Sequence, residues 1–201
     1  MTIYDATTVD GCEPPARPLH LQTLEAAYKL GIDYHDKGNI LAAESHLLRA
    51  SKGYEETCGL HDSKTLDALE YLGITYRKLV KLNEAETTHK RVVEARTAVS
   101  GPDHTTTLVA WNRLAMVYRA QGRLDEAEEI YRRVWETLDK TLGSNDEATL
   151  RASISLGNIA FNRKSFTEAG EMYASALSRP LAIWQLCASI KNDTQKQRPY
   201  S

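Results

Sequence analysis

Residues 122–133 read GRLDEAEEIYRR, in which a glycine is followed five residues later by Ala-Glu. The same frame begins at Gly38, in the stretch GNILAAESHLLRA. It occurs a third time in VKLNEAETTHKR (80–91), where Val80 takes the place of the glycine. Since the frame returns at a constant interval, it indicates a tandem repeat.

Several other residue types recur at the same interval of 42 residues. They include a Thr-Leu pair, a leucine followed by a small residue, an alanine and a connector glycine. These series are Thr23, Thr65, Thr107 and Thr149; Leu30, Leu72, Leu114 and Leu156; Ala43, Ala85, Ala127 and Ala169; and Gly59, Gly101 and Gly143. Matches without insertion predict four copies, at about 22–63, 64–105, 106–147 and 148–178.

Each copy is predicted to form two antiparallel helices. The apolar residues of the third copy follow helical spacing, first at Trp111, Leu114, Ala115 and Tyr118 and then at Ala127, Ile130, Tyr131 and Val134. Gly38 and Gly122 are expected to end the first helices in a left-handed conformation. In the connectors a glycine stop precedes Asp, Asn or Thr, which can cap the next helix. The small residues after each leucine would let neighbouring helices approach closely.

The order Leu-Gly, Tyr, Gly, then Ala with an aromatic residue four positions later resembles the tetratricopeptide repeat. HEAT repeats lack this order, and propeller blades would need alternating strands that the sequence does not show. The 42-residue period and connectors such as GPDHTTTL (101–108) are similar to the kinesin light chain branch of the family. The resemblance covers about residues 18–178. It implies an all-α, right-handed superhelical solenoid of four helix pairs.

The two ends are expected to differ from the array. Residues 1–17 are predicted to be disordered, and residues 179–201 to form an irregular cap or tail. Pro180 is expected to stop the last helix near Ser178. The following LAIWQLCASI (181–190) is a candidate capping helix for the open end, and truncation of a longer gene is the alternative.

Composition excludes several classes of protein. Of 201 residues, 42% are hydrophobic and 26% charged, and the net charge is −2, which gives no global field for nucleic acid or membrane. Three scattered cysteines and the absence of a visible signal peptide favour a soluble, cytoplasmic protein.

No motif for catalysis is visible. The sequence lacks a phosphate-binding loop, a dinucleotide fingerprint and a nucleophile elbow. The histidines are scattered, and His61 and His104 are interpreted as capping or connector residues rather than metal ligands. We therefore expect no enzyme activity, no cofactor and no metal.

The predicted function is binding of an extended, acidic peptide in a concave groove lined by the first helix of each copy. The groove is expected to be acidic at its start, through residues such as Asp67 and Glu70, and basic toward its end. Arginines would meet carboxylates, and asparagines would hold the peptide backbone. The predicted lining is Ile74, Arg77, Lys78, Asn112, Met116, Arg119, Arg151, Ile154 and Asn158. The resemblance also implies acidic cargo peptides with a tryptophan or tyrosine, and Asn112 occupies the family's Asn-x-Leu-Ala position.

Two alternatives stay open at this stage. The chain is also consistent with a sensor fragment of a larger NTPase of the NACHT or NB-ARC type, or with a self-associating structural array. A kinesin-adaptor role is not inferred, because no heptad segment is present. The protein is otherwise expected to be a monomer or to associate weakly.

Overall fold

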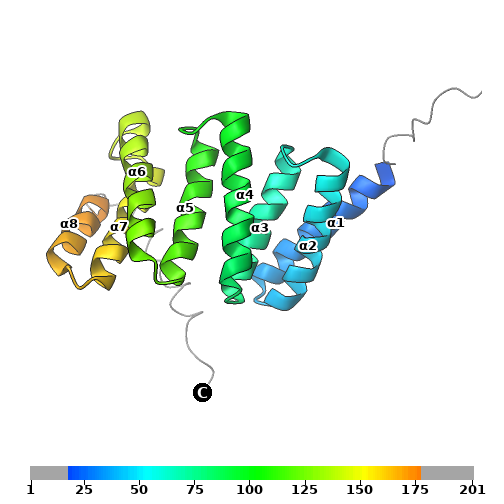
Figure 1. Ribbon diagram of the computed structural model, residues 1–201, viewed down its shortest axis with the longest axis horizontal. Coiled ribbons are helices and arrows are strands. Elements are labelled where there is room, and N and C mark those ends of the chain that lie inside the picture. Colours follow the sequence, from blue (N-terminus) through cyan, green and yellow to red (C-terminus); the bar gives the residue numbers. More distant parts are fainter. Residues whose placement is uncertain (1–17, 178–201) are drawn as a thin grey trace, which may run out of the picture.

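The computed structural model describes residues 18–177, which form eight α-helices and no β-strand. The helices follow one another in a single row from α1 to α8 (Figure 1). Their bounds are α1 Pro18–Asp36, α2 Ile40–Cys58, α3 Ser63–Lys78, α4 Leu82–Ser100, α5 Thr105–Ala120, α6 Leu124–Leu142, α7 Glu147–Asn162 and α8 Phe166–Leu177. The predicted all-α array of four helix pairs is confirmed.

Each helix packs chiefly against its neighbours in sequence. Among helices that are not consecutive, α1 lies in contact with α3, and α3 with α5. The first helices of successive copies therefore approach one another. In a curved stack the helices that approach most closely lie on the inner side. The odd-numbered helices accordingly line the concave face and the even-numbered helices the convex face.

The turn within each copy has a left-handed residue at one fixed position. Gly38 and Gly122 have φ of 82° and 80°, as predicted. Val80 and Lys164 occupy the same position in the other two copies with φ of 60° and 62°. Side chains with a Cβ disfavour this region, so the repeat geometry overrides the local preference there.

Side chains from the connectors cap three of the first helices. Asp62 accepts a hydrogen bond from the backbone of α3, and Asp146 does so for α7. For α5 the cap is His104, whose Nδ1 lies 3.3 Å from the backbone nitrogen of Thr106. The expected cap of Asp, Asn or Thr was therefore wrong for α5, although the capping role expected of His104 is confirmed.

Small residues on the first helices make room for the second helix of the same copy. A Cβ added at Gly73 would lie 2.6 Å from the ring of His89, and one at Gly157 would lie 2.7 Å from Tyr173. Both distances are far below van der Waals contact. The expected role of these small residues, close helix approach, is what the structure shows.

A ladder of ion pairs joins successive copies along the second helices. In three copies, the glutamate that follows the repeated alanine pairs with a cation from the next copy. That cation lies in the turn between the two helices of its own copy. The pairs are Lys81–Glu44 at 2.6 Å, Arg123–Glu86 at 2.9 Å and Arg163–Glu128 at 2.9 Å. Lys81 and Arg123 share one repeat position, whereas Arg163 lies two residues before the corresponding Ser165. In the fourth copy Gly170 takes the glutamate position. The fourth copy therefore lacks the glutamate of this ladder.

The predictions for residues 1–17 and 179–201, including the candidate cap, lie outside the described residues. Within 18–177, no helix is both long and apolar enough to cross a bilayer.

Candidate peptide-binding face

The nine residues predicted to line the groove all lie on first helices. Ile74, Arg77 and Lys78 belong to α3, Asn112, Met116 and Arg119 to α5, and Arg151, Ile154 and Asn158 to α7. Lys78 and Arg151 are exposed, and the other seven are half-buried. They thus form one strip across three copies on the concave side.

The charges of two arginines at the same repeat position act on one tyrosine. Burial raises the pKa of Tyr131 to about 12, and the charges of Arg119 and Arg77 oppose that rise. The two guanidinium groups come from successive copies. Arg119 makes no ion pair with any carboxylate of residues 18–177. Its charge is available to a ligand.

The two asparagines of the strip differ in what they can still bind. The Tyr173 hydroxyl donates to Asn158 Oδ1 over 2.8 Å. This bond occupies part of the acceptor capacity of Asn158 and leaves its amide N–H groups for a ligand. Asn112 has no side-chain bond of this kind within the described chain. It is the better placed of the two to bind a peptide backbone through both its donor and its acceptor.

Arg151 is engaged with its own helix. Its Nη2 lies 2.6 Å from Glu147 Oε1 one turn earlier, and both side chains are about 70% exposed. An exposed pair of this kind contributes only about 0.3–0.5 kcal/mol. A carboxylate from a ligand could therefore compete for Arg151, but with less gain than at Arg119.

The acidic start of the groove is neutralised inside the protein. Arg96 Nη2 lies 2.6 Å from Asp67 Oδ1 and 3.3 Å from Glu70 Oε1, and Arg113 Nε lies 3.2 Å from Glu70 Oε2. Burial raises the pKa of Glu70, while Arg113 and Arg96 act against the rise. The expectation of an acidic patch is thus corrected, because two arginines balance the two carboxylates.

Sequence reasoning missed Arg96 and Arg113. Arg96 interrupts a series in which the other copies have Tyr54 and Leu138, both buried. A charged residue in an apolar series was the available signal. Its partner could not be named without knowing which residues of α3 and α5 face α4.

The floor beneath this face contains a buried histidine. His89 is 1% exposed, and neither ring nitrogen has a hydrogen-bond partner. Burial lowers the pKa of His89 to about 3, and the charges of Arg113 and Arg77 act in the same direction. His89 is therefore neutral at physiological pH and serves the packing against Gly73.

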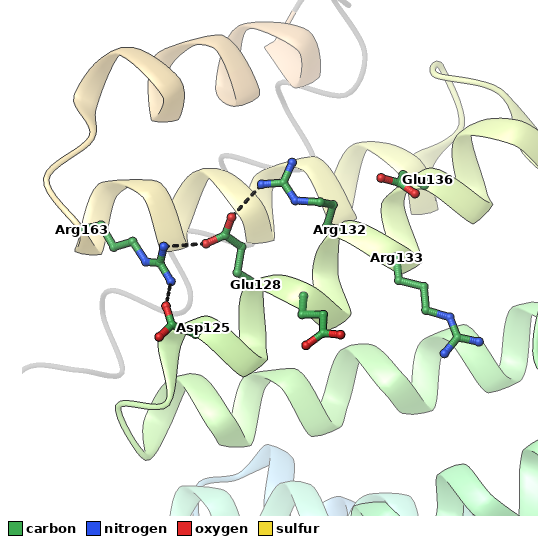
Figure 2. A pocket seen from close by; sticks show the side chains of 7 residues that line it. Asp125, Glu128, Arg132, Arg133, Glu136 and Arg163 are labelled. Atoms are coloured by element: carbon green, nitrogen blue, oxygen red, sulfur yellow. Dashed lines mark hydrogen bonds and ion pairs between the residues drawn. The ribbon is translucent and has the colours of Figure 1, made fainter.

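A charged cavity of about 450 Å³ lies on the outer side of α6, at its contact with α7. Figure 2 shows that Arg132 and Arg163 both reach Glu128, and that Arg163 also reaches Asp125. Because Asp125, Glu128, Arg132 and Arg163 satisfy one another, this group is a contact between copies.

No group of three or more His, Cys, Asp or Glu side chains that could hold an ion occurs between residues 18 and 177. Cys58 is a free, exposed cysteine in this part of the chain.

Comparison with solved structures places the fold among helical repeats. It is similar to kinesin light chain-type, nearly identical TPR-like repeats from Podosopora anserina (TM-score 0.69, 22% identity, 80% of this chain and 76% of that one). BtubC (BKLC) from P. vanneervenii gives a TM-score of 0.68 at 16% identity, over 89% of this chain and 66% of that one. The Rap conjugation gene regulator of plasmid pLS20, solved with the Phr* peptide, gives 0.63 at 14% identity, over 82% and 43%.

Comparison of sequences identifies the family. A search of curated proteins found no significant match. A family model described as a tetratricopeptide repeat matches residues 22–98, 64–140 and 106–180, three windows that together cover most of the chain. The chain belongs to the tetratricopeptide repeat family.

Proposed function

We propose that this protein is a non-enzymatic interaction module that binds an extended, acidic peptide segment along its concave face. The single observation that carries the proposal is Arg119, a half-buried cation on that face without a carboxylate partner among residues 18–177. Leaving such a charge partly desolvated is unfavourable unless a ligand or solvent compensates it. A carboxylate can do so with charge-assisted hydrogen bonds.

The surroundings of Arg119 suit a peptide rather than an isolated anion. Met116 and Asn112 lie one and two helical turns before it on α5. Asn112 can bind a peptide backbone, and Met116 offers an adaptable apolar contact. Ile74 and Ile154 are half-buried positions on the flanking first helices and extend the apolar floor. A peptide with an acidic residue and an aromatic or aliphatic side chain fits this sequence of contacts.

The family supports the general class of function. Tetratricopeptide repeats typically mediate contacts between proteins, and a structurally similar regulator was solved with a peptide bound. The acidic specificity rests on the charges described above. Scattered cysteines favour a reducing compartment, so we place this interaction in the cytoplasm.

The test is fluorescence anisotropy of a labelled acidic peptide that contains one tryptophan, titrated with wild type and Arg119→Glu. Charge reversal should weaken binding more than tenfold, because it replaces an attraction by a repulsion at the anchor. Arg49→Glu is the matched control, since Arg49 is an exposed residue on the second helix α2 and the change in net charge is identical. Binding should also weaken as salt is raised.

Two results would contradict the proposal. One is the absence of saturable binding by protein that circular dichroism shows to be helical. The other is an equal loss of affinity in Arg119→Glu and Arg49→Glu, which would indicate attraction by net charge rather than by the concave face.

A further inference from the structure

A hollow of about 570 Å³ opens on the convex side of the molecule, between α4 and α5. Its floor is Trp111, Leu114 and Tyr118 of α5. Its wall is formed by residues of α4, namely Lys90, Val93, Glu94, Thr97 and Ala98. A second hollow of about 220 Å³ lies on the other side of Trp111, toward α6. Sites that bind small groups usually enclose about 300–1,000 Å³ and have mainly apolar linings. None of the nine concave residues lines either hollow.

Comparison with the preceding copy explains why the hollow is open. There Arg91 of α4 reaches Glu55 of α2, with Nη2 and Oε1 2.5 Å apart, and bridges the two second helices. The residues 42 positions later are Arg133 and Thr97. Thr97 is too short to reach Arg133, and its hydroxyl donates to the carbonyl of Val93 over 2.7 Å. The bridge is therefore missing above Trp111.

Arg133 is consequently left at the mouth of an apolar site. Its Cζ lies 5.8 Å from the centre of the Trp111 ring, and no carboxylate between residues 18 and 177 lies within ion-pair distance of it. Figure 2 shows its guanidinium directed away from Glu136. Glu94 lines the larger hollow beside Lys90, whose charge is paired with Glu86 at 2.7 Å, and Glu126 and Glu129 line the smaller one. These carboxylates repel a ligand that carries several negative charges. A ligand with a single negative charge, which Arg133 can pair, is still accommodated.

We propose that this convex cleft is a second binding site, which takes a peptide segment with an aromatic side chain and one adjoining carboxylate. The aromatic group lies against Trp111, where ring pairs add to the gain from burial. The carboxylate pairs with Arg133 and takes the role that Glu55 has toward Arg91. The site is independent of the concave face, so a molecule with both sites occupied would contact partners on opposite sides of the solenoid.

The experiment uses a pair of fluorescent probes with the same aromatic body. Anilinonaphthalene sulfonate carries one negative charge, and N-phenylnaphthylamine carries none; both brighten in apolar sites. Wild type is titrated with each, beside Arg133→Gln and Thr97→Glu. Arg49→Gln is the control, because Arg49 is an exposed residue on α2 that lines neither hollow, and its change in net charge equals that of Arg133→Gln.

The charged probe is expected to bind wild type and to lose about fivefold in affinity in Arg133→Gln, the size of one exposed ion pair. The neutral probe should bind both proteins equally. Thr97→Glu restores the bridge of the preceding copy and should weaken both probes, while Arg49→Gln should change neither. If Thr97→Glu fails to fold, Ala98→Phe at an exposed position of the wall obstructs the hollow instead.

Three outcomes would overturn the proposal. They are the absence of saturable probe binding, equal binding by wild type and the obstructed variants, and a loss of the neutral probe in Arg133→Gln as large as that of the charged probe.

Discussion

Replacing His89 by leucine should make the array markedly more resistant to mild acid. His89 is 1% exposed and has a pKa of about 3 in the folded protein, against about 6.5 in an unfolded chain. The unfolded state therefore takes up a proton at a pH at which the folded state cannot. Since the folded pKa is depressed, stability is complete above pH 6.5 and falls as the pH drops toward 3.

The magnitude follows from these two values. Each pH unit below the unfolded pKa costs about 1.4 kcal/mol of unfolding free energy, so that going from pH 7 to pH 5 removes about 2 kcal/mol through His89 alone. Leucine at this position has a precedent, because Leu47 takes it in the first copy and packs against Gly31. The variant also removes two buried ring nitrogens that have no partner, which should leave it at least as stable at pH 7.

Urea unfolding followed by circular dichroism between pH 5 and pH 8 measures this effect. The difference in unfolding free energy between His89→Leu and wild type should grow by about 2 kcal/mol as the pH falls from 7 to 5. His61→Ala, which removes an exposed histidine from a connector, controls for composition. Parallel loss of stability in wild type and His89→Leu would refute the assignment of His89 as a buried, neutral group.

Two further predictions concern backbone and packing. Gly73→Ala should lower the free energy of unfolding by about 1–3 kcal/mol, because the new methyl group meets the His89 ring; Gly170→Ala, with nothing within 4 Å of the added carbon, should raise it by about 1 kcal/mol through helix propensity. Equal effects of the two changes in urea titrations would show that packing is not the cause. Val80→Gly should raise the unfolding free energy by up to about 1 kcal/mol, because it removes a β-branched residue from a left-handed turn. A lower urea midpoint for Val80→Gly would mean that the φ of this residue is not strained.

Much of the fold could be predicted from the sequence because the repeat is encoded locally. The period of 42 residues, the apolar spacing within each helix and the turn glycines each depend on residues close together in the chain. Packing between neighbouring copies then follows, since every copy meets the next in the same way. The role of Gly73, which lets the helix carrying His89 approach closely, could be predicted for the same reason.

The state of the candidate site was not predictable in this way. The positions on the first helices were identified by spacing, but spacing says nothing about which charges are already neutralised. Glu70 was expected to present an acidic surface and is instead paired with Arg96 and Arg113, which lie on two other helices. Arg119 differs from these arginines, because no carboxylate of residues 18–177 lies within ion-pair distance of it.

The sequence by itself thus determined the number of copies, the helix pairs and the turn positions, because these depend on periodic and short-range patterns. Only the tertiary structure decided that Val80 adopts a left-handed turn and that the exchange of Glu55 for Thr97 opens a cleft over Trp111. The physical reason is that ion pairs and cavities arise between helices that are far apart in the chain. A side chain's role there depends on what lies opposite it, and one substitution in the repeat changes that partner while the period stays the same.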